Sequence, residues 1–199
     1  MRRARLLEPL WSALLALAAV GAALVSQHHF DMQPCPWCVL QRLLFVMVAL
    51  VALIELAALV LRSRNPLQDA LDGQRRGVGV KRHPQASVAL PMLAGLRSWV
   101  AACGLAAALW QHVVAASSAS CNLTLADRLM AFTGLDGLLP EIFQPRASCL
   151  EAKAWLLGVP YELWSGVLFA ALAVMALWSL KTTMRSPSGR SAAPAIDRP

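Results

Sequence analysis

Charged side chains are scarce in this sequence, and their scarcity is the first guide to the class of protein. Only 15% of the 199 residues are Asp, Glu, Lys or Arg, whereas 58% are hydrophobic. Soluble domains carry charge on about a quarter of their residues. The composition therefore differs from that of an ordinary soluble domain and favours a membrane protein.

Stretches with little or no charge are long enough to cross a membrane. Leu10 to Phe30 contains no Asp, Glu, Lys or Arg, and three later stretches contain a single charge each. A hydrocarbon core of about 30 Å requires about 20 residues of helix. We therefore predict an all-α membrane protein, a four-transmembrane-helix bundle within residues 1–185. The expected helices lie at about residues 10–30, 39–61, 88–112 and 159–180.

Two of the single charges need an explanation, because a charge inside the bilayer is costly. Glu55 lies near enough to the end of its stretch to reach the interface, and we expect a tolerated interfacial acid. A functional intramembrane acid is the alternative. For Arg97 we expect a side chain that reaches out to the cytoplasmic surface from the third helix. The alternative is a span that starts at Ser98.

The N-terminal segment resembles a secretory signal, since Arg2, Arg3 and Arg5 precede an apolar stretch. The apolar stretch is slightly long for a signal core, and no convincing small-x-small cleavage site follows it. We therefore expect an uncleaved membrane anchor.

Basic residues mark one side of the predicted membrane. Thirteen of the 18 Lys and Arg residues lie before the first helix, between the second and third, or after the fourth. The positive-inside rule assigns all three groups, and both termini, to the cytoplasm. Residues 62–87 then form a basic cytoplasmic loop and residues 186–199 a disordered cytoplasmic tail. No basic patch is interleaved with aromatic residues, so we expect no nucleic-acid partner.

Four of the five cysteines fall on the opposite, outer side. Cys35 and Cys38 lie in the short connection before the second helix, and Cys121 and Cys149 lie in the long loop after the third. Disulfides persist on the outer side, and the four thiols come as two pairs. The fifth, Cys103, is inside the third helix, where we expect a small buried apolar residue.

Cys35 and Cys38 are well placed for redox chemistry. The second helix is predicted to begin near Trp37 or Cys38, where the positive end of the helix dipole favours a thiolate. Arg42 follows Cys38 by four residues, one turn along the same face, and adds a fixed cation. Its guanidinium is also able to bind a carbonyl oxygen of a ligand at this depth.

Two other interpretations of this cysteine pair remain open. One is a structural disulfide, although a ring that encloses only two residues gains little from loop closure. The other is a zinc site completed by His28 and His29. Adjacent histidines cannot easily both bind one ion, and the oxidising side favours disulfides, so we expect no metal.

The long outer loop, residues 113–158, contains a segment that alternates loosely between apolar and polar positions. This segment, residues 123–140, also contains glycines that break any long helix. We expect a short interfacial helix here. A loop tethered in this way would be able to bring Cys121 or Cys149 towards Cys35.

The stretch Cys35-Pro-Trp-Cys38-Val-Leu-Gln-Arg42 resembles the signature of the disulfide bond formation protein B (DsbB) family. The second outer cysteine pair, and "LGVPYELWSG" before the fourth helix, extend the resemblance over nearly the whole chain. The cytoplasmic loop is longer than the family pattern, and Cys103 is an additional thiol. Neither departure affects the outer side.

The resemblance implies a bacterial inner-membrane enzyme that passes electrons through two cysteine pairs. A Cys121–Cys149 disulfide would react, through Cys121, with a reduced periplasmic thiol oxidase of the DsbA type. The electrons would pass to Cys35 and Cys38, and from Cys38 to a membrane quinone, ubiquinone or menaquinone. Arg42 would lie beside the quinone oxygen.

The resemblance also implies that His112, at the outer end of the third helix, approaches the quinone; a plain interfacial histidine is the alternative. Vitamin K epoxide reductase-like proteins share the four helices and both kinds of cysteine pair, but their Cys-x-x-Cys pair follows the loop cysteines. The order here argues against that family. A DsbB relative with one dedicated partner, and a non-catalytic membrane module with structural or metal-binding cysteines, remain open.

Overall fold

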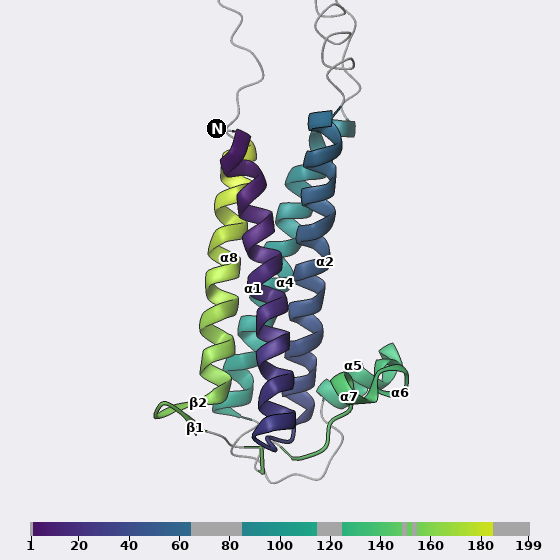
Figure 1. Ribbon diagram of the computed structural model, residues 1–199, viewed down its shortest axis with the longest axis vertical. Coiled ribbons are helices and arrows are strands. Elements are labelled where there is room, and N and C mark those ends of the chain that lie inside the picture. Colours follow the sequence, from purple (N-terminus) through teal and green to yellow (C-terminus); the bar gives the residue numbers. More distant parts are fainter. Residues whose placement is uncertain (1, 65–84, 115–124, 149–150, 153–154, 185–199) are drawn as a thin grey trace, which may run out of the picture.

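Four long helices lie side by side and form a bundle (Figure 1). The computed structural model describes residues 2–64, 85–114, 125–148, 151–152 and 155–184. The bundle helices are α1 (Arg2–His29), α2 (Pro36–Arg64), α4 (Gln85–Val113) and α8 (Tyr161–Met184).

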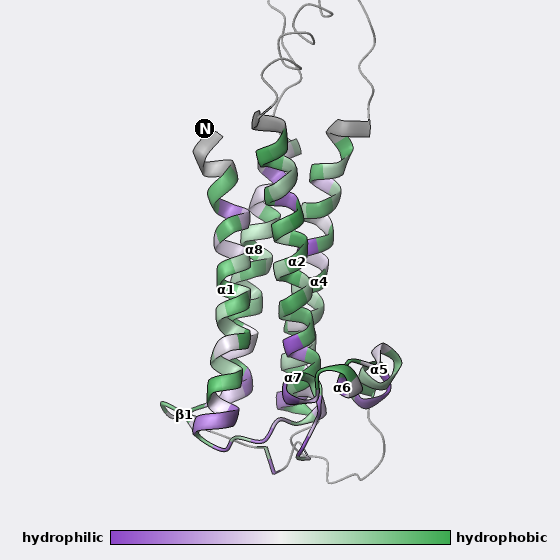
Figure 2. Cartoon of the chain, turned by 45° about the vertical axis from the view of Figure 1, so that its right-hand side comes forward, coloured by the Kyte–Doolittle hydropathy of each residue, from purple (hydrophilic) through white to green (hydrophobic). Residues whose placement is uncertain are grey.

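Each bundle helix contains a segment that is long and apolar enough to cross a membrane. Between 22 and 39% of the residues in each segment are buried inside the protein, so most of the apolar side chains face outward. Figure 2 shows the same property as green along the four long helices. A soluble bundle would hide these side chains, whereas a bilayer solvates them. The predicted all-α, four-helix membrane protein is confirmed.

The helices begin at residues that differ somewhat from the predicted ones. α1 begins at Arg2 rather than near residue 10, because the basic N-terminal segment is itself helical. α2 begins at Pro36, whose fixed φ and missing N–H suit the first helical position. α8 begins at Tyr161, because the two residues before it belong to a strand.

The predicted cytoplasmic loop at residues 62–87 is shorter at both ends, since α2 continues to Arg64 and α4 begins at Gln85. The rest of that loop, and the tail at residues 186–199, lie outside the described residues.

A stacked pair of aromatic rings forms the middle of the bundle core. The rings of Phe45 on α2 and Phe169 on α8 have centroids 3.8 Å apart and planes inclined by 7°. Gly104 on α4 lies directly beneath the Phe169 ring, where a Cβ atom would overlap the ring atoms. The missing side chain therefore lets α4 and α8 approach closely at this level.

A buried cluster of charges joins the helices in the half of the bundle farther from the cysteines. Arg97 on α4 is 0% exposed, and its Nη2 donates to both carboxylate oxygens of Glu8 on α1, at 2.8 and 2.7 Å. The carboxylate of Glu55 on α2 lies 3.4 Å from the same nitrogen and accepts from the Ser179 hydroxyl of α8. All four helices therefore contribute to the cluster.

This cluster corrects two predictions. Arg97 does not reach out to the membrane surface, and Glu55 is not an interfacial acid, since both are buried in the bundle. The physical reason is that opposite charges in a region of low dielectric lower one another's cost when they are paired. Because the first helix was expected to begin near residue 10, Glu8 lay outside it and was not considered as a partner of Arg97. Cys103, expected to be buried, is partly exposed on α4.

Three short helices project sideways from the end of the bundle at which α2 begins (Figures 1 and 2). They are α5 (Leu125–Thr133), α6 (Leu135–Leu138) and α7 (Pro140–Phe143). Gly134, with φ of 65°, ends α5, as expected of a glycine in this segment. Ala126 and Met130 are buried against the start of α2, whereas Phe132 is 90% exposed. The short amphipathic helix expected in this loop is α5.

A β-hairpin lies at the same end of the bundle, on the side away from α5 in Figure 1. β1 (Trp155–Leu156) pairs antiparallel with β2 (Val159–Pro160). The turn residues Leu157 and Gly158 both have positive φ, 55° and 77°, as a type I′ turn requires. Because Trp164 Nε1 donates to the Leu156 carbonyl at 3.3 Å, the hairpin is held over the first turns of α8.

Candidate active site

The first turn of α2 positions both sulfurs of the Cys-x-x-Cys pair. The Val39 amide donates to the Cys35 carbonyl at 3.0 Å, so Cys35 caps the helix and Pro36 is its first residue. The Cys38 amide, one of the first-turn N–H groups, donates to the Cys35 sulfur at 3.4 Å. The two Sγ atoms lie 2.9 Å apart, within hydrogen-bond distance. This geometry allows the thiols to exchange a proton or close into a disulfide with little movement.

The two sulfurs differ in access. Cys35 is 0% exposed and packs among Trp37, Val39 and Met130, in a cluster between the start of α2 and α5. Cys38 is partly exposed and lines a cavity of about 220 Å³ inside the bundle. A ligand in this cavity would therefore meet Cys38 rather than Cys35.

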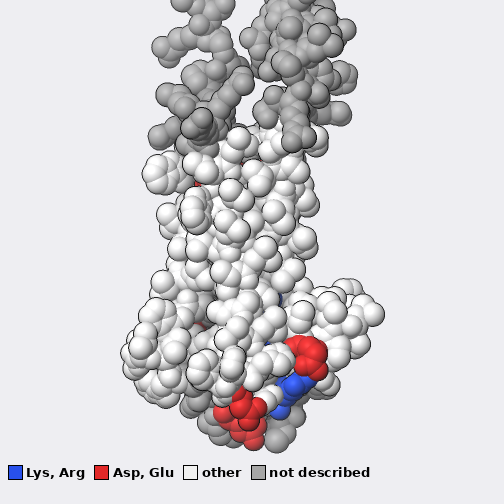
Figure 3. Space-filling model, viewed as in Figure 1, with Lys and Arg blue, Asp and Glu red and all other residues white. Residues whose placement is uncertain are grey.

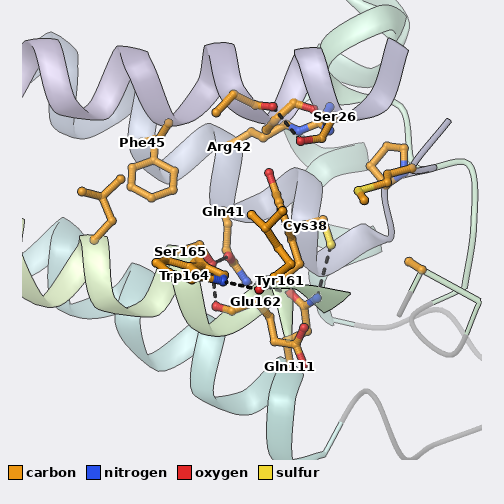
Figure 4. Close-up of a pocket in the computed structure, with 18 of the residues that line it drawn as sticks. Ser26, Cys38, Gln41, Arg42, Phe45, Gln111, Tyr161, Glu162, Trp164 and Ser165 are labelled. Carbon is orange, nitrogen blue, oxygen red and sulfur yellow. Dashed lines mark hydrogen bonds between the residues drawn. The ribbon is translucent and has the colours of Figure 1, made fainter. Parts of the chain in front are cut away.

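The cavity is largely apolar, with polar groups gathered at its cysteine end (Figure 4). The small side chains of Ala19, Ala22 and Ala23 on α1 form one wall. Helix α2 contributes Cys38 and other side chains, and α8 contributes Trp164 among others. Such a combination of apolar walls and a few convergent polar groups is typical of small-molecule sites.

Arg42 lines the same cavity and is 5% exposed. Its Nη1 donates to the Gln27 side-chain oxygen at 2.7 Å and to the Ile142 carbonyl at 3.0 Å, and its Nη2 donates to the Ala23 carbonyl at 3.3 Å. Among the described residues, none of the ion pairs involves Arg42. Neutral acceptors thus hold the guanidinium in place and leave its charge available to the cavity.

A chain of side-chain hydrogen bonds ends on the Cys38 sulfur. Gln111 Nε2 on α4 donates to Cys38 Sγ at 3.2 Å, and Gln41 Nε2 on α2 donates to Gln111 Oε1 at 2.7 Å. Ser165 on α8 in turn contacts Gln41 Oε1. Sequence reasoning missed all three residues. Two glutamines in otherwise apolar helix ends were the available signal.

His112, named as a quinone neighbour, is not among the residues that line the cavity. Its Nδ1 lies 3.0 Å from a carboxylate oxygen of Glu162 on α8, and Glu162 itself lines the cavity. Gln111, the residue directly before His112, does line the cavity.

Cys121 and Cys149 lie outside the described residues, but the chain that follows Cys121 and the chain that precedes Cys149 both come close to the first pair. Leu125, four residues after Cys121, begins α5, which packs against the start of α2. The Ala147 amide, two residues before Cys149, donates to the Pro34 carbonyl at 3.3 Å. Pro34 directly precedes Cys35.

Among the described residues, the view in Figure 3 shows a group of exposed acidic and basic side chains at the cysteine end, while the visible side of the bundle is almost entirely white. Glu141 on α7 lies 3.4 Å from His28 Nε2 at the end of α1 and accepts a hydrogen bond from Arg146 at 3.1 Å. The hydrogen bond with His28, and then that with Arg146, lower the pKa of Glu141 below its ordinary value. These contacts join α7 to the end of α1.

In the described part of the chain, the side chains are not arranged as the zinc site considered above would require. His28 uses its Nδ1 on the Leu24 carbonyl and its Nε2 on Glu141, and no group of three metal-ligating side chains converges there.

The chain is similar in sequence to known proteins over most of its length. The sequence model of the family "Disulfide bond formation protein DsbB" matches residues 7–179. The chain is 30% identical to a disulfide bond formation protein B of Azoarcus sp., over 87% of this chain and 92% of the relative. It is 31% identical to proteins of the same description from Aromatoleum aromaticum, over 84% and 89%, and Polaromonas naphthalenivorans, over 82% and 87%.

Proposed function

The chain belongs to the disulfide bond formation protein DsbB family, and from this we propose that it is an inner-membrane protein-dithiol:quinone oxidoreductase. In this function the protein reoxidises a periplasmic thiol oxidase of the DsbA type and passes the electrons to membrane quinone. The family membership gives the coarser activity, an oxidoreductase of disulfide formation. The partner, the acceptor and the orientation are our proposal.

The observation that carries the proposal is that Cys38 and Arg42 line one apolar cavity inside a bundle of membrane-spanning length. A quinone has a flat head with carbonyl oxygens and a long apolar tail. The apolar wall suits the tail, and Arg42 and the glutamine side chains suit the carbonyl oxygens. The residues present therefore fit such an acceptor.

A quinone takes up two electrons and two protons, and a dithiol that becomes a disulfide releases the same number. Cys35 and Cys38 supply both electrons, and Cys38 is the sulfur that faces the acceptor. Arg42 binds an acceptor oxygen and holds a positive charge beside the sulfur and the oxygen on which negative charge develops. The apolar walls exclude water, which strengthens this interaction.

The loop pair would deliver electrons from the partner. A thiolate of the reduced partner attacks the Cys121–Cys149 disulfide, and two exchanges make the partner's disulfide and leave the loop pair reduced. A loop thiolate then attacks Cys35 of the Cys35–Cys38 disulfide, and Cys38 leaves as a thiolate with the electron pair of the broken S–S bond. The second loop thiol attacks the mixed disulfide, which restores the loop disulfide and releases Cys35 as the other thiol of the reduced pair. The hydrogen bond between Ala147 and Pro34 supports this path, because it holds the chain next to Cys149 near Cys35.

Turnover with purified protein tests the proposal. In detergent with a short-chain quinone, the protein should oxidise a reduced thioredoxin-fold partner with one quinone reduced for each disulfide formed. Cys38→Ser should abolish quinone reduction, whereas Cys103→Ser should leave it unchanged. If Cys35→Ser and Cys38→Ser both retain quinone reduction, the proposed relay is wrong.

A further inference from the structure

The amide of Gln111 is the one side-chain amide in the described part of the chain that donates to the sulfur of Cys38. Gln111 lies on α4, where it is 6% exposed, and reaches Cys38 across the interface between α2 and α4. A hydrogen bond in such a buried position competes with little water, so its effect on the charge of the sulfur is larger than at a surface.

In the structure the N–H end of the Gln111 amide faces the sulfur and its oxygen faces Gln41. Gln41 Nε2 donates to Gln111 Oε1 at 2.7 Å, so the oxygen of Gln111 is occupied and its Nε2 points to Cys38. The oxygen of Gln41 is in turn in contact with the Ser165 hydroxyl. The chain therefore runs in one direction, from Ser165 through Gln41 and Gln111 to the sulfur, with an N–H group at its end (Figure 4).

The hydrogen of the Ser165 hydroxyl sets this direction. Ser165 Oγ also lies 2.8 Å from the Glu162 carbonyl, and a hydroxyl has a single hydrogen to donate. When that hydrogen points to Gln41, each amide in the chain presents its N–H to the next acceptor. When it points to Glu162, Gln41 is free to turn and donate to Ser165, and Gln111 then presents its oxygen to Cys38. The second arrangement suits a Cys38 thiol, and the first suits a thiolate.

We propose that Gln111 is a further catalytic residue, which stabilises the thiolate of Cys38, and that Gln41 and Ser165 are positioning residues that aim its N–H group. The inference rests on the proposed function. When the loop thiolate attacks Cys35, the Cys35–Cys38 bond breaks and its electron pair stays on Cys38. Gln111 donates to the sulfur that receives this negative charge, and no proton has to be transferred in that step.

Arg42 does not make this contact in the structure: its three hydrogen bonds go to Gln27, Ala23 and Ile142. Its charge acts over a distance, whereas the Gln111 amide makes direct contact with the sulfur. The two residues thus act on Cys38 from different helices and by different means.

Alkylation of Cys38 tests the inference without quinone or partner. The protein is reduced, freed of quinone in detergent and treated with iodoacetamide, and modification of Cys38 is followed by site-resolved mass spectrometry. A hydrogen bond to a charged group changes an equilibrium by about tenfold or more. Since thiolate nucleophilicity partly offsets a change in thiolate fraction, we expect Gln111→Leu to slow alkylation about three- to tenfold at about pH 7.

Two further measurements distinguish lost ionisation from lost access or altered packing. At about pH 10 the thiol ionises in both proteins, and the more basic thiolate of the variant is the stronger nucleophile, so the variant should react at least as fast as the unsubstituted protein. Gln111→Glu keeps the shape of the side chain and replaces the N–H donor, so it should also react slowly at neutral pH. The matched control, Gln144→Leu at an exposed position beyond α7, should react like the unsubstituted protein.

Unchanged alkylation in both Gln111 variants near neutral pH would overturn the inference, and so would an equal loss of rate at both pH values. If Gln111→Leu does not fold, Gln41→Leu, which keeps Gln111 and removes its orienting contact, decides the matter by the same criteria. A protein that alkylates as expected but reduces no quinone would contradict the proposed function and leave the role of Gln111 standing.

Discussion

Arg97 on α4 donates from one nitrogen to both carboxylate oxygens of Glu8 on α1, at 2.8 and 2.7 Å. The arginine is completely buried, and Glu55 lies within 3.4 Å of the same nitrogen. Two acids thus share one cation between membrane-spanning helices. Their mutual dependence leads to the first of five predictions.

Arg97→Met should destabilise the bundle, because it leaves the buried Glu55 and the partly buried Glu8 without their cation. Removal of one partner of a buried ion pair costs roughly 3–5 kcal/mol, and we expect a loss of this order in thermal unfolding in detergent. Arg146→Met, which breaks an exposed pair with Glu141, is the matched control and should melt like the unsubstituted protein. Equal melting of the two variants would contradict a supporting role for the cluster.

Gly104→Ala and Gly95→Ala should have opposite effects, although both glycines lie on α4. A Cβ atom at Gly104 would overlap the Phe169 ring, and overpacking of this kind costs about 1–3 kcal/mol. A Cβ atom at Gly95 meets nothing within 4 Å, so the gain in helix propensity should stabilise by about 0.5–1 kcal/mol. The midpoint of unfolding is measured for both variants. Stabilisation by Gly104→Ala would show that α4 and α8 are farther apart at this level than the structure has them.

Arg42→Lys should impair quinone use although it keeps the positive charge. A lysine has one nitrogen and cannot reproduce the separate contacts that Nη1 and Nη2 make with Ile142 and Ala23. The loss of a charge-assisted hydrogen bond predicts a fall in kcat/KM for quinone of about tenfold or more. Arg128→Ala, at an exposed position on α5, should leave the parameter unchanged. A lysine variant with ordinary quinone kinetics would argue that only the charge matters.

The junction between α1 and α7 should weaken in acid. Because His28 and Arg146 lower the pKa of Glu141 in the folded protein, its contribution to stability is present above the ordinary value of 4.5 and is lost as the pH falls through the lower folded value. Amide hydrogen exchange at residues 140–148, corrected for intrinsic rates, should therefore increase below about pH 4.5. Glu141→Gln should show faster exchange already at neutral pH. If the hydrogen-exchange profile of Glu141→Gln matches that of the unsubstituted protein, the Glu141 carboxylate does not stabilise this junction.

The fifth prediction is the side of the membrane on which each end of the bundle lies, and it rests on the distribution of the basic residues. A cysteine placed at Ser148 should react with an impermeant maleimide added to intact spheroplasts, since the cysteine end is expected in the periplasm. A cysteine at Lys181, near the end of α8, should react only after permeabilisation. The reverse pattern would invert the proposed topology and separate the cysteine pairs from a periplasmic partner.

The sequence predicted the four spans, and the placement of Cys38 and Arg42 one turn apart, because both depend on local properties. Hydrophobic length identifies a membrane helix, and spacing within a helix identifies which side chains share a face. Cys38 and Arg42 do line the same cavity.

Side chains that depend on contacts between helices were not predictable in the same way. Successive residues on a helix differ by about 100° in direction, and the sequence does not give the rotation of α4 about its own axis, which decides whether Gln111 or His112 faces the cavity. The pairing of Arg97 with Glu8 spans 89 residues of sequence and requires that α1 and α4 be in place. The hairpin was missed because Leu157 occupies a left-handed conformation that favours glycine.

The Glu8–Arg97 pair also constrains the biogenesis of the protein. During synthesis, α1 leaves the ribosome long before Arg97 has been made, and for that interval Glu8 has no cation on α4. Until α4 arrives at the translocon, the water and lipid headgroups at the membrane surface have to solvate this carboxyl in place of Arg97. Insertion of the first helix is therefore completed only by the third.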